Sequence, residues 1–177
     1  MNKGHIYLIG MMGSWKSTVG RKLAKRIELP FCDIDTMVEE RLHMSIAQIF
    51  KHLGEKRFRE VETQIMCGIS TLPPSIVATG GGLALAENNR RIMGDTGFIV
   101  QLNADTDTLA ERIKSTRHRP LLWNQESIPQ KLEEIWQERK LIYDECADTT
   151  IKTDNHTVDE IVAQIHQYLI EIHYVSN

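Results

Sequence analysis

Short apolar runs alternate with longer amphipathic stretches along most of the 177-residue chain. An apolar run of strand length followed by a helical pattern is typical of βαβ units, in which parallel strands lie between layers of helices. Several of the runs are apolar throughout, as expected for strands that helices cover on both faces. The pattern predicts five strands, at His5–Ile9, Pro30–Asp33, Ser75–Thr79, Phe98–Leu102 and Thr149–Lys152.

The amphipathic stretches predict eight helices, because their apolar residues recur at three- and four-residue spacing. The last of them begins with Thr157 and Glu160 in the spacing of a capping box. Between Ser115 and Ser127 the periodicity fails, which indicates a loop long enough to move. The predicted helices are Lys16–Glu28, Asp35–His43, Ser45–Leu53, Glu55–Thr71, Ala86–Gly94, Asp105–Ser115, Pro129–Ala147 and Thr157–Ile172.

Length, composition and charge narrow the class of protein. A chain of 177 residues with 41% hydrophobic and 25% charged residues fits one globular domain, residues 1–177. The net charge of −3 argues against general nucleic-acid binding, which needs a basic surface. No apolar run approaches the roughly 20 residues of a membrane span. We expect a cytoplasmic protein with reduced cysteines, because Cys32, Cys67 and Cys146 form no Cys-x-x-Cys pair and no signal peptide is evident.

A phosphate-binding loop follows the first strand. Residues 10–18, Gly-Met-Met-Gly-Ser-Trp-Lys-Ser-Thr, lead from that strand directly into a helix. Strand, loop and helix in this order form an anion cradle from backbone N–H groups and a helix N-terminus. Lys16 would then reach the β- and γ-phosphates of a nucleotide, and the Ser17 hydroxyl would bind Mg²⁺. The alternative is an ordinary turn that happens to place a lysine at the start of the helix.

Trp15 stands where this motif has its second glycine. Glycine there permits a positive φ and close approach of the phosphates, and a tryptophan forced into positive φ costs about 1–3 kcal/mol. The sequence leaves four outcomes open: weak nucleotide binding, a distorted loop, an unusual geometry with its own compensation, or an indole that points away from a nearly normal loop.

Several charged residues also come directly after predicted strands or on predicted helices. Asp33 and Asp35 come at the end of the second strand. Residues two apart on a strand point to the same face, so one carboxylate could bind in the Mg²⁺ shell and the other could face an acceptor hydroxyl. The alternative is that Asp35 caps the next helix and Asp33 is solvated. The charged run at 54–62 could be a solvated helix face, and the glycines at 80–82 could form either a close approach to a ligand or a tight turn.

Together these motifs resemble the shikimate kinase family. The ordered set is the phosphate loop, Asp-x-Asp, Gly-Glu-x-x-Phe-Arg, Thr-Gly-Gly-Gly, Arg-Pro-Leu-Leu and Arg-x-x-x-Tyr, and it spans His5 to about Ile172. The resemblance implies an α/β, three-layer αβα P-loop kinase fold, with a five-stranded parallel sheet in the order 2-3-1-4-5 and a mobile lid at about 112–125. It also implies transfer of the γ-phosphoryl group of ATP to the 3-hydroxyl of shikimate, on the route to chorismate and the aromatic amino acids.

The resemblance implies a role for each matching residue. On the nucleotide side, Arg112 would lie near adenine, Arg119 in the lid would reach the transferred phosphoryl group, and Ser17 and Asp33 would hold Mg²⁺. The residues expected to contact ATP are Gly13, Ser14, Trp15, Lys16, Ser17, Thr18, Arg112, Arg119 and Asn155.

On the substrate side, Asp35 would bind the shikimate hydroxyls and orient or deprotonate the nucleophile, so that Asp35, Lys16 and Arg119 form the catalytic set. Arg59 and Arg139 would bind the substrate carboxylate, since a planar guanidinium suits bidentate binding. Gly81 and Gly82 would approach the ring.

Two other functions fit the same residues. One is a shikimate-binding or regulatory module of the same fold that no longer turns over. The other is a P-loop kinase for another small hydroxy acid, although a neutral acceptor would not need the two arginines. The resemblance implies ATP and shikimate as the binding partners and a monomer. The net charge and the short apolar runs argue against nucleic acid and membrane as partners.

Overall fold

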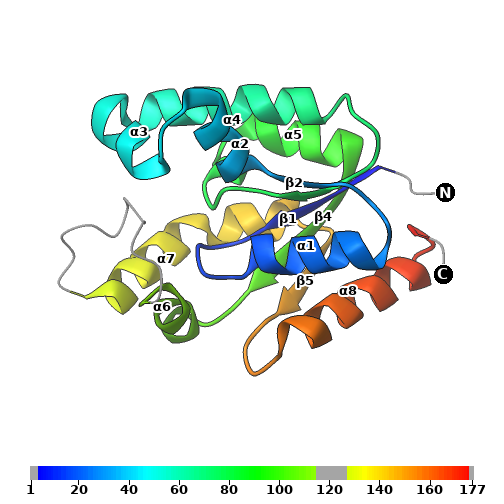
Figure 1. Cartoon of the computed structure of the whole chain (residues 1–177). Helices are drawn as coiled ribbons and strands as arrows, with labels where there is room; N and C mark the ends of the chain where they lie inside the picture. Colours follow the sequence, from blue (N-terminus) through cyan, green and yellow to red (C-terminus); the bar gives the residue numbers. More distant parts are fainter. Residues whose placement is uncertain (1–3, 115–126, 176–177) are drawn as a thin grey trace.

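The computed structural model describes residues 4–114 and 127–175, and its core is one five-stranded parallel sheet between layers of helices (Figure 1). The strand order is β2-β3-β1-β4-β5, which confirms the order implied by the resemblance. The strands are β1 (His5–Ile9), β2 (Phe31–Asp33), β3 (Ile76–Ala78), β4 (Gly97–Asn103) and β5 (Thr149–Lys152). The helices are α1 (Lys16–Arg26), α2 (Ile34–Leu42), α3 (Ile46–His52), α4 (Gly54–Ile69), η1 (Leu83–Leu85, a 3₁₀ helix), α5 (Glu87–Thr96), α6 (Thr106–Lys114), α7 (Ile128–Cys146) and α8 (Val158–Glu171).

The predicted elements are confirmed with small shifts of their ends. Two strands have the predicted bounds, and the other three differ by one residue at one or both ends. Each helix end that falls on a described residue lies within two residues of its predicted position. The sequence pattern missed η1, because three residues are too few to show helical periodicity. This short helix follows the glycine run, where Leu83 and Leu85 donate backbone hydrogen bonds to Gly80 and Gly82.

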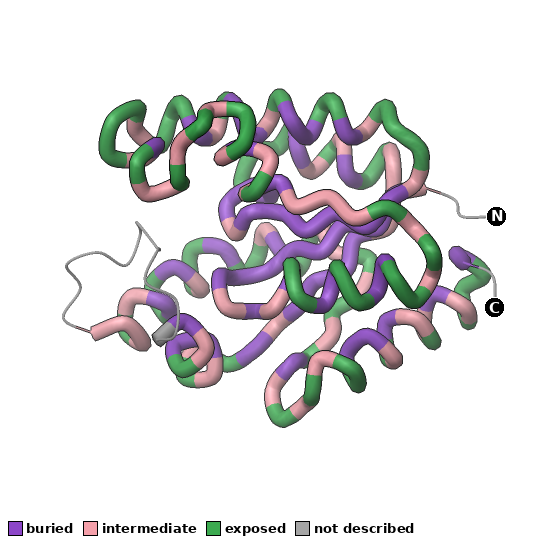
Figure 2. The backbone as a smooth tube through the Cα atoms, in the orientation of Figure 1, coloured by how far each residue is buried: buried purple, intermediate pink, exposed green. Residues whose placement is uncertain are grey.

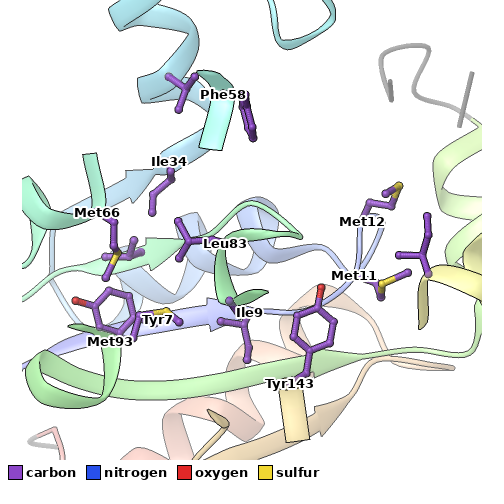
Figure 3. Close-up of a cluster of buried hydrophobic side chains, with 14 of the residues drawn as sticks. Tyr7, Ile9, Met11, Met12, Ile34, Phe58, Met66, Leu83, Met93 and Tyr143 are labelled. Carbon is purple, nitrogen blue, oxygen red and sulfur yellow. The ribbon is translucent and has the colours of Figure 1, made fainter. Parts of the chain in front are cut away.

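Two hydrophobic cores lie on opposite faces of the sheet, and β1 contributes to both. Successive side chains of a strand point to opposite faces. Tyr7 and Ile9 therefore pack into one core with residues of α4, α5 and α7, whereas Ile6 and Leu8 pack into the other with residues of α1 and α8. Figure 2 shows the central strands as buried, and Figure 3 shows the first core in detail. Each fully buried aliphatic side chain contributes about 1.5–3 kcal/mol, so the sheet is held firmly from both sides.

The register of the sheet brings three loops together. Leu8 of β1 and Asp33 of β2 both pair with Ala78 of β3, so these three strands end side by side. The residues that follow them are the phosphate-binding loop, the start of α2 and the glycine run. Ligands of open parallel sheets bind at this carboxyl edge, which makes it the place to look for a site.

Helix ends follow local signals in the sequence. The predicted capping box is present, because the Thr157 hydroxyl accepts from the backbone N–H of Glu160 and the Glu160 carboxylate accepts from that of Thr157. In contrast, α1 has Trp15 at its N-cap position and no side-chain cap, which leaves its first N–H groups to other acceptors. Over the ranges 4–114 and 127–175, none of the helices has the length and apolar character needed to cross a bilayer.

Candidate functional site

The loop from Gly10 to Trp15 joins β1 to α1 and has the shape of an anion cradle. Gly13 adopts φ 82°, which a residue with a side chain rarely adopts, and Ser14 is fully buried. The backbone N–H of Ser14 donates to the carbonyl of Met11, which closes the turn. The loop ends at the N-terminus of α1, where the helix dipole and N–H groups favour negative charge. The predicted phosphate-binding loop is therefore present in its structural context.

The Lys16 ammonium lies inside this loop. It is 2.8 Å from the carbonyl oxygens of both Gly10 and Met11 and 3.4 Å from the Ser14 hydroxyl. Only 9% of the residue is exposed. A phosphate oxygen would compete with these neutral carbonyl acceptors for the ammonium, and it would do so with the advantage of its charge.

Trp15 takes the left-handed conformation that a glycine would have supplied. Its φ is 68° and its ψ is 20°, and its carbonyl accepts the first helical hydrogen bond from Val19. The indole stacks on Arg112, with the guanidinium carbon 3.5 Å from the ring centroid. The loop therefore keeps a left-handed residue here despite the bulky side chain, and the indole lies beside the loop in contact with a cation.

Besides its contact with the indole, Arg112 bonds to the segment that follows β5. Its two terminal nitrogens donate to the hydroxyl and the carbonyl of Thr153, at 2.8 and 2.7 Å. Burial lowers the pKa of Arg112, and the nearby charge of Asp154 partly offsets this effect. Asn155, predicted in the adenine loop, is an exposed turn residue at φ 56°, two residues beyond this contact.

The two aspartates after β2 do not share a strand face as predicted. The strand ends at Asp33 and α2 begins at Ile34, so Asp35 already lies in the first helical turn. The alternative interpretation is also wrong in its assignment of the cap, because Asp33, not Asp35, caps the helix through the Thr36 N–H at 3.3 Å. Asp35 instead lines the cavity that contains Lys16. The two aspartates do not share a strand face because no linker separates β2 from α2.

Arg59 lies on α4 between two carboxylates. It pairs with Glu55 at 3.1 Å and with Glu62 at 2.8 Å. Burial alone would lower the pKa of Arg59, but these two carboxylates raise it overall. A Cβ added to Gly82 would lie 2.4 Å from an Arg59 nitrogen, so the glycine permits the guanidinium to pack against the backbone. The structure therefore brings Arg59 against Gly82, two residues that the sequence analysis assigned to the same substrate.

Glu62 is a site residue that the sequence analysis missed. Its side chain is 1% exposed, and its Oε1 has no hydrogen-bond partner within residues 4–114 and 127–175. Burial raises the pKa of Glu62 to about 7 against the attraction of Arg59, and the neighbouring Asp35 adds to the increase. A Cβ at Gly80 would lie within 3 Å of the carboxylates of both Glu62 and Asp35, at 2.3 and 2.7 Å. The glycine therefore permits two carboxylates to approach the same point.

Arg139 reaches the same segment from α7. It donates to the carbonyl of Gly81 at 3.0 Å, as does the hydroxyl of Tyr143. Burial raises the pKa of Tyr143, which keeps the phenol neutral and able to donate. The Nε of the buried Arg139 has no hydrogen-bond partner in the part of the chain that is described. Figure 3 places Tyr143 in the same buried cluster as Met11 and Met12 of the phosphate-binding loop.

One cavity of about 300 Å³ joins these features. It runs from the phosphate-binding loop to Asp35 and the glycine run, and it includes the Trp15–Arg112 pair. Its lining residues are Met12, Gly13, Trp15, Lys16, Ser17, Thr18, Asp35, Thr79, Gly81 and Arg112. Arg59 and Arg139 do not line it among the described residues, but Arg59 lies against Gly82 and Arg139 donates to the carbonyl of Gly81.

Some predicted residues are placed elsewhere or not at all. Asp33 and Asn155 do not line the cavity among the described residues. Arg119 and most of the predicted lid, residues 115–126, lie outside the described part of the chain. Glu62 was missed because it belongs to a run of charged residues that looks like a solvated face. The signal that could have found Glu62 is its position three residues after Arg59 on the face of α4 that carries Phe58 and Ile65.

The donors available for Mg²⁺ are oxygen atoms, the class that this ion prefers. Ser17 presents a hydroxyl to the cavity and Asp35 a carboxylate. No cluster of three or more metal-ligating side chains occurs among the residues that the structure describes. This composition fits an ion held by one or two protein oxygens together with phosphates and water, as is usual for Mg²⁺ in nucleotide sites.

Comparison with known proteins agrees with this geometry. The shikimate kinase family model matches residues 12–170. Shikimate kinases of Geobacter sulfurreducens and of Sulfurihydrogenibium sp. are 36% and 39% identical to the chain, over 94% and 91% of its length and 91% and 95% of theirs. A solved structure of shikimate kinase from Acinetobacter baumannii in complex with shikimate matches with a TM-score of 0.91 and 32% identity, over 96% of this chain and 94% of that one. On this evidence the chain belongs to the shikimate kinase family.

Proposed function

We propose that this chain transfers the γ-phosphoryl group of ATP to the 3-hydroxyl of shikimate, which gives shikimate 3-phosphate and ADP. The observation that carries the proposal is the single cavity in which a phosphate cradle, Lys16 and Asp35 face the same space. Two buried or half-buried arginines lie at its acceptor end. The proposal includes a role on the route to chorismate and the aromatic amino acids, and a monomer that works in the cytoplasm, where ATP is available.

The substrate carboxylate binds Arg59 and Arg139. Arg139 is 7% exposed and Arg59 is half-buried, so both interact with an anion more strongly than they would in bulk water. The Arg139 Nε without a described partner is a donor that a carboxylate would satisfy. A hydroxy acid held at its carboxylate then presents its ring toward Gly81 and Asp35.

Asp35 accepts a hydrogen bond from the attacking hydroxyl and takes up its proton. Its neighbour Glu62 places a second carboxylate near it, which favours protonation of one of the two. Lys16 neutralises the charge that develops on the transferred phosphoryl group, and Arg119 adds a second cation from the lid. Phosphoryl transfer depends mainly on such positioning and charge neutralisation, so no strong base is required.

Ser17 would hold Mg²⁺ through its hydroxyl, and Asp33 or Asp35 would supply a carboxylate near it. When bound, the ion neutralises charge on the β- and γ-phosphates. Asp35 lines the cavity, whereas Asp33 caps α2. Either aspartate would therefore approach the ion from the N-terminal end of α2, and not from a strand face that the two share.

The assay for this function is release of ADP from Mg-ATP with shikimate, shikimate methyl ester and gluconate as acceptors. Shikimate should stimulate ADP release with saturation, the ester should do so poorly because it lacks the carboxylate, and the open-chain acid should be the weakest. Equal stimulation by all three acceptors, or by none, would overturn the assignment. Preference for gluconate would indicate a kinase for another small hydroxy acid.

Exchange of Gly82 for alanine is expected to raise the KM for shikimate by roughly tenfold to a hundredfold, because a displacement of about 1 Å in a positioning group can cost that much. Gly82 has φ −110°, so alanine causes no backbone strain, but its Cβ would lie 2.4 Å from Arg59. Steady-state kinetics with both substrates varied should show an unchanged KM for ATP. The matched control is Gly68→Ala on α4, where a Cβ would have no neighbour within 4 Å. If Gly82→Ala and Gly68→Ala had the same KM for shikimate, the placement of Arg59 at the substrate carboxylate would be contradicted.

Shikimate affinity is expected to fall as the pH rises from 6 to 8. Burial holds the pKa of Glu62 at about 7, well above the ordinary range of a glutamate. A substrate carboxylate beside Arg59 would raise it further, so binding takes up a proton and weakens once Glu62 is ionised. A further increase of half to one pKa unit corresponds to roughly a twofold to fivefold loss of affinity between pH 6 and pH 8. Titration calorimetry in buffers of different ionisation enthalpy measures both the affinity and the proton uptake. Glu62→Gln should bind with the same affinity at both pH values, and an equal pH dependence in the two proteins would show that another group titrates.

A further inference from the structure

The sheet order places the two ends of the cavity on opposite sides of the phosphate-binding loop. Asp35 follows β2 and Gly81 follows β3, on one side of the central strand β1. Arg112 is bonded to Thr153, which follows β5 on the other side. A nucleotide whose terminal phosphate faces Asp35 must therefore extend its nucleoside toward Trp15 and Arg112.

The cation at that nucleoside end already carries an aromatic ring. Arg112 is a flat cation that two bonds to Thr153 hold in position. A flat cation of this kind attracts the face of an aromatic ring. Here the ring is the indole of Trp15, whose centroid is 3.5 Å from the guanidinium carbon. The indole also packs against the apolar core between the sheet, α1 and α8.

An indole and a purine are both flat, bicyclic aromatic systems. Trp15 therefore offers Arg112 the same kind of contact that a purine base would offer. It does so from a residue of the phosphate-binding loop itself, next to Lys16, and lines the cavity that the nucleotide would enter. A base that stacks on the face of the guanidinium that the indole covers competes with the indole, so the indole must be moved when a base binds there.

We infer that the Trp15 indole is an internal competitor for the nucleotide base, and that ATP binding displaces it from Arg112. The inference rests on the proposed function, because it takes ATP as the phosphoryl donor. It assigns Trp15 the role of a residue that sets nucleotide affinity through the base rather than through the phosphate cradle. A chain with glycine at position 15 would have no such competitor.

Two ligands separate these effects. Mg-ATP uses both the cradle and the nucleoside end, whereas tripolyphosphate uses only the cradle. The readout is the ratio of the tripolyphosphate Kd to the ATP Kd, measured by titration calorimetry for the parent chain, Trp15→Ala and Trp15→Gly. Alanine removes the indole but keeps a side chain that disfavours φ 68°, whereas glycine removes both the indole and the strain.

The ratio is expected to rise about tenfold in Trp15→Ala and in Trp15→Gly, in line with the strength of a partly buried cation–π contact. Any change that the two ligands share in Trp15→Gly reports on the loop conformation and cancels in the ratio. An unchanged ratio in both variants would overturn the inference. A lower ratio would also overturn it, because the indole would then help to bind the base.

Fluorescence of Trp15 gives a second readout in the chain that keeps this residue. In a Trp123→Phe/Trp136→Phe background, ATP should change the Trp15 emission as the ring leaves Arg112, and tripolyphosphate should not. Equal changes with both ligands would contradict displacement by the base. Shikimate-dependent ADP release by the same preparations tests the proposed function separately. If the enzyme is active but the ratio is unchanged, the inference about Trp15 is overturned and the proposed function stands. If the folded protein binds no ATP, both the inference and the proposed function are overturned.

Discussion

Exchange of Lys16 for methionine is expected to lower kcat by about 10³-fold, the effect of removing one well-placed group that stabilises charge in the transition state. Lys16 is the cation of the phosphate-binding loop, with its ammonium 2.8 Å from two loop carbonyls. Methionine keeps the length and the apolar stem of the side chain. Steady-state ADP release at saturating shikimate measures the effect.

The matched control is Lys22→Met, on the same helix. Lys22 is half-exposed and pairs with Asp159 at 2.7 Å, far from the cavity. It should retain nearly the full kcat, since an exposed ion pair contributes about 0–1 kcal/mol. Binding of shikimate to both variants shows that they are folded. A Lys16→Met enzyme within tenfold of the parent would contradict the assignment of this loop to the transferred phosphate.

Exchange of Arg139 for methionine is expected to raise the KM for shikimate by roughly 30-fold to 5000-fold, because truncation of a buried, hydrogen-bonded charge pair costs about 2–5 kcal/mol. Arg139 is 7% exposed and donates to Gly81 at the acceptor end of the cavity. The KM for ATP should change little, since Arg139 does not line the nucleoside end. Initial rates with both substrates varied separate the two constants.

Arg90→Met is the control for loss of an arginine–backbone contact. Arg90 donates to the carbonyls of Ala84 and Leu85 at 2.8 and 2.9 Å, only a few residues after the glycine run. If both variants raised the KM for shikimate equally, Arg139 would act by supporting the backbone of the glycine run and not by binding the substrate. A larger effect at Arg139, absent with shikimate methyl ester, would identify direct binding of the carboxylate.

The elements that the sequence predicted best are those with strong local signals. The alternation of apolar and amphipathic stretches located all five strands, and the Thr157–Glu160 spacing predicted a capping box that the structure contains. The order of the strands came from the family resemblance, since periodicity alone does not specify which strands are neighbours. The phosphate-binding loop was recognisable because its residues are consecutive.

The parts that the sequence could not predict depend on residues far apart in the chain. Trp15 and Arg112 meet only because α6 packs beside the phosphate-binding loop, where Gly13 approaches Ile113. The buried environment of Glu62 depends on the approach of Gly80 from β3, and nothing in its charged neighbourhood indicates it. Asp35 lies in a helical turn and not on the predicted strand face, because α2 begins immediately after β2.

The most direct test of the account is identification of the product formed from Mg-ATP and shikimate by ³¹P NMR, for the parent chain and for Trp15→Gly. The account predicts a monophosphate ester at the 3-hydroxyl of shikimate from both proteins, formation of the same ester about 10³-fold more slowly by Lys16→Met, and a lower KM for ATP in Trp15→Gly. A folded parent chain that binds shikimate but forms no phosphate ester, with or without Trp15, would contradict it and identify a non-catalytic binding module of the same fold.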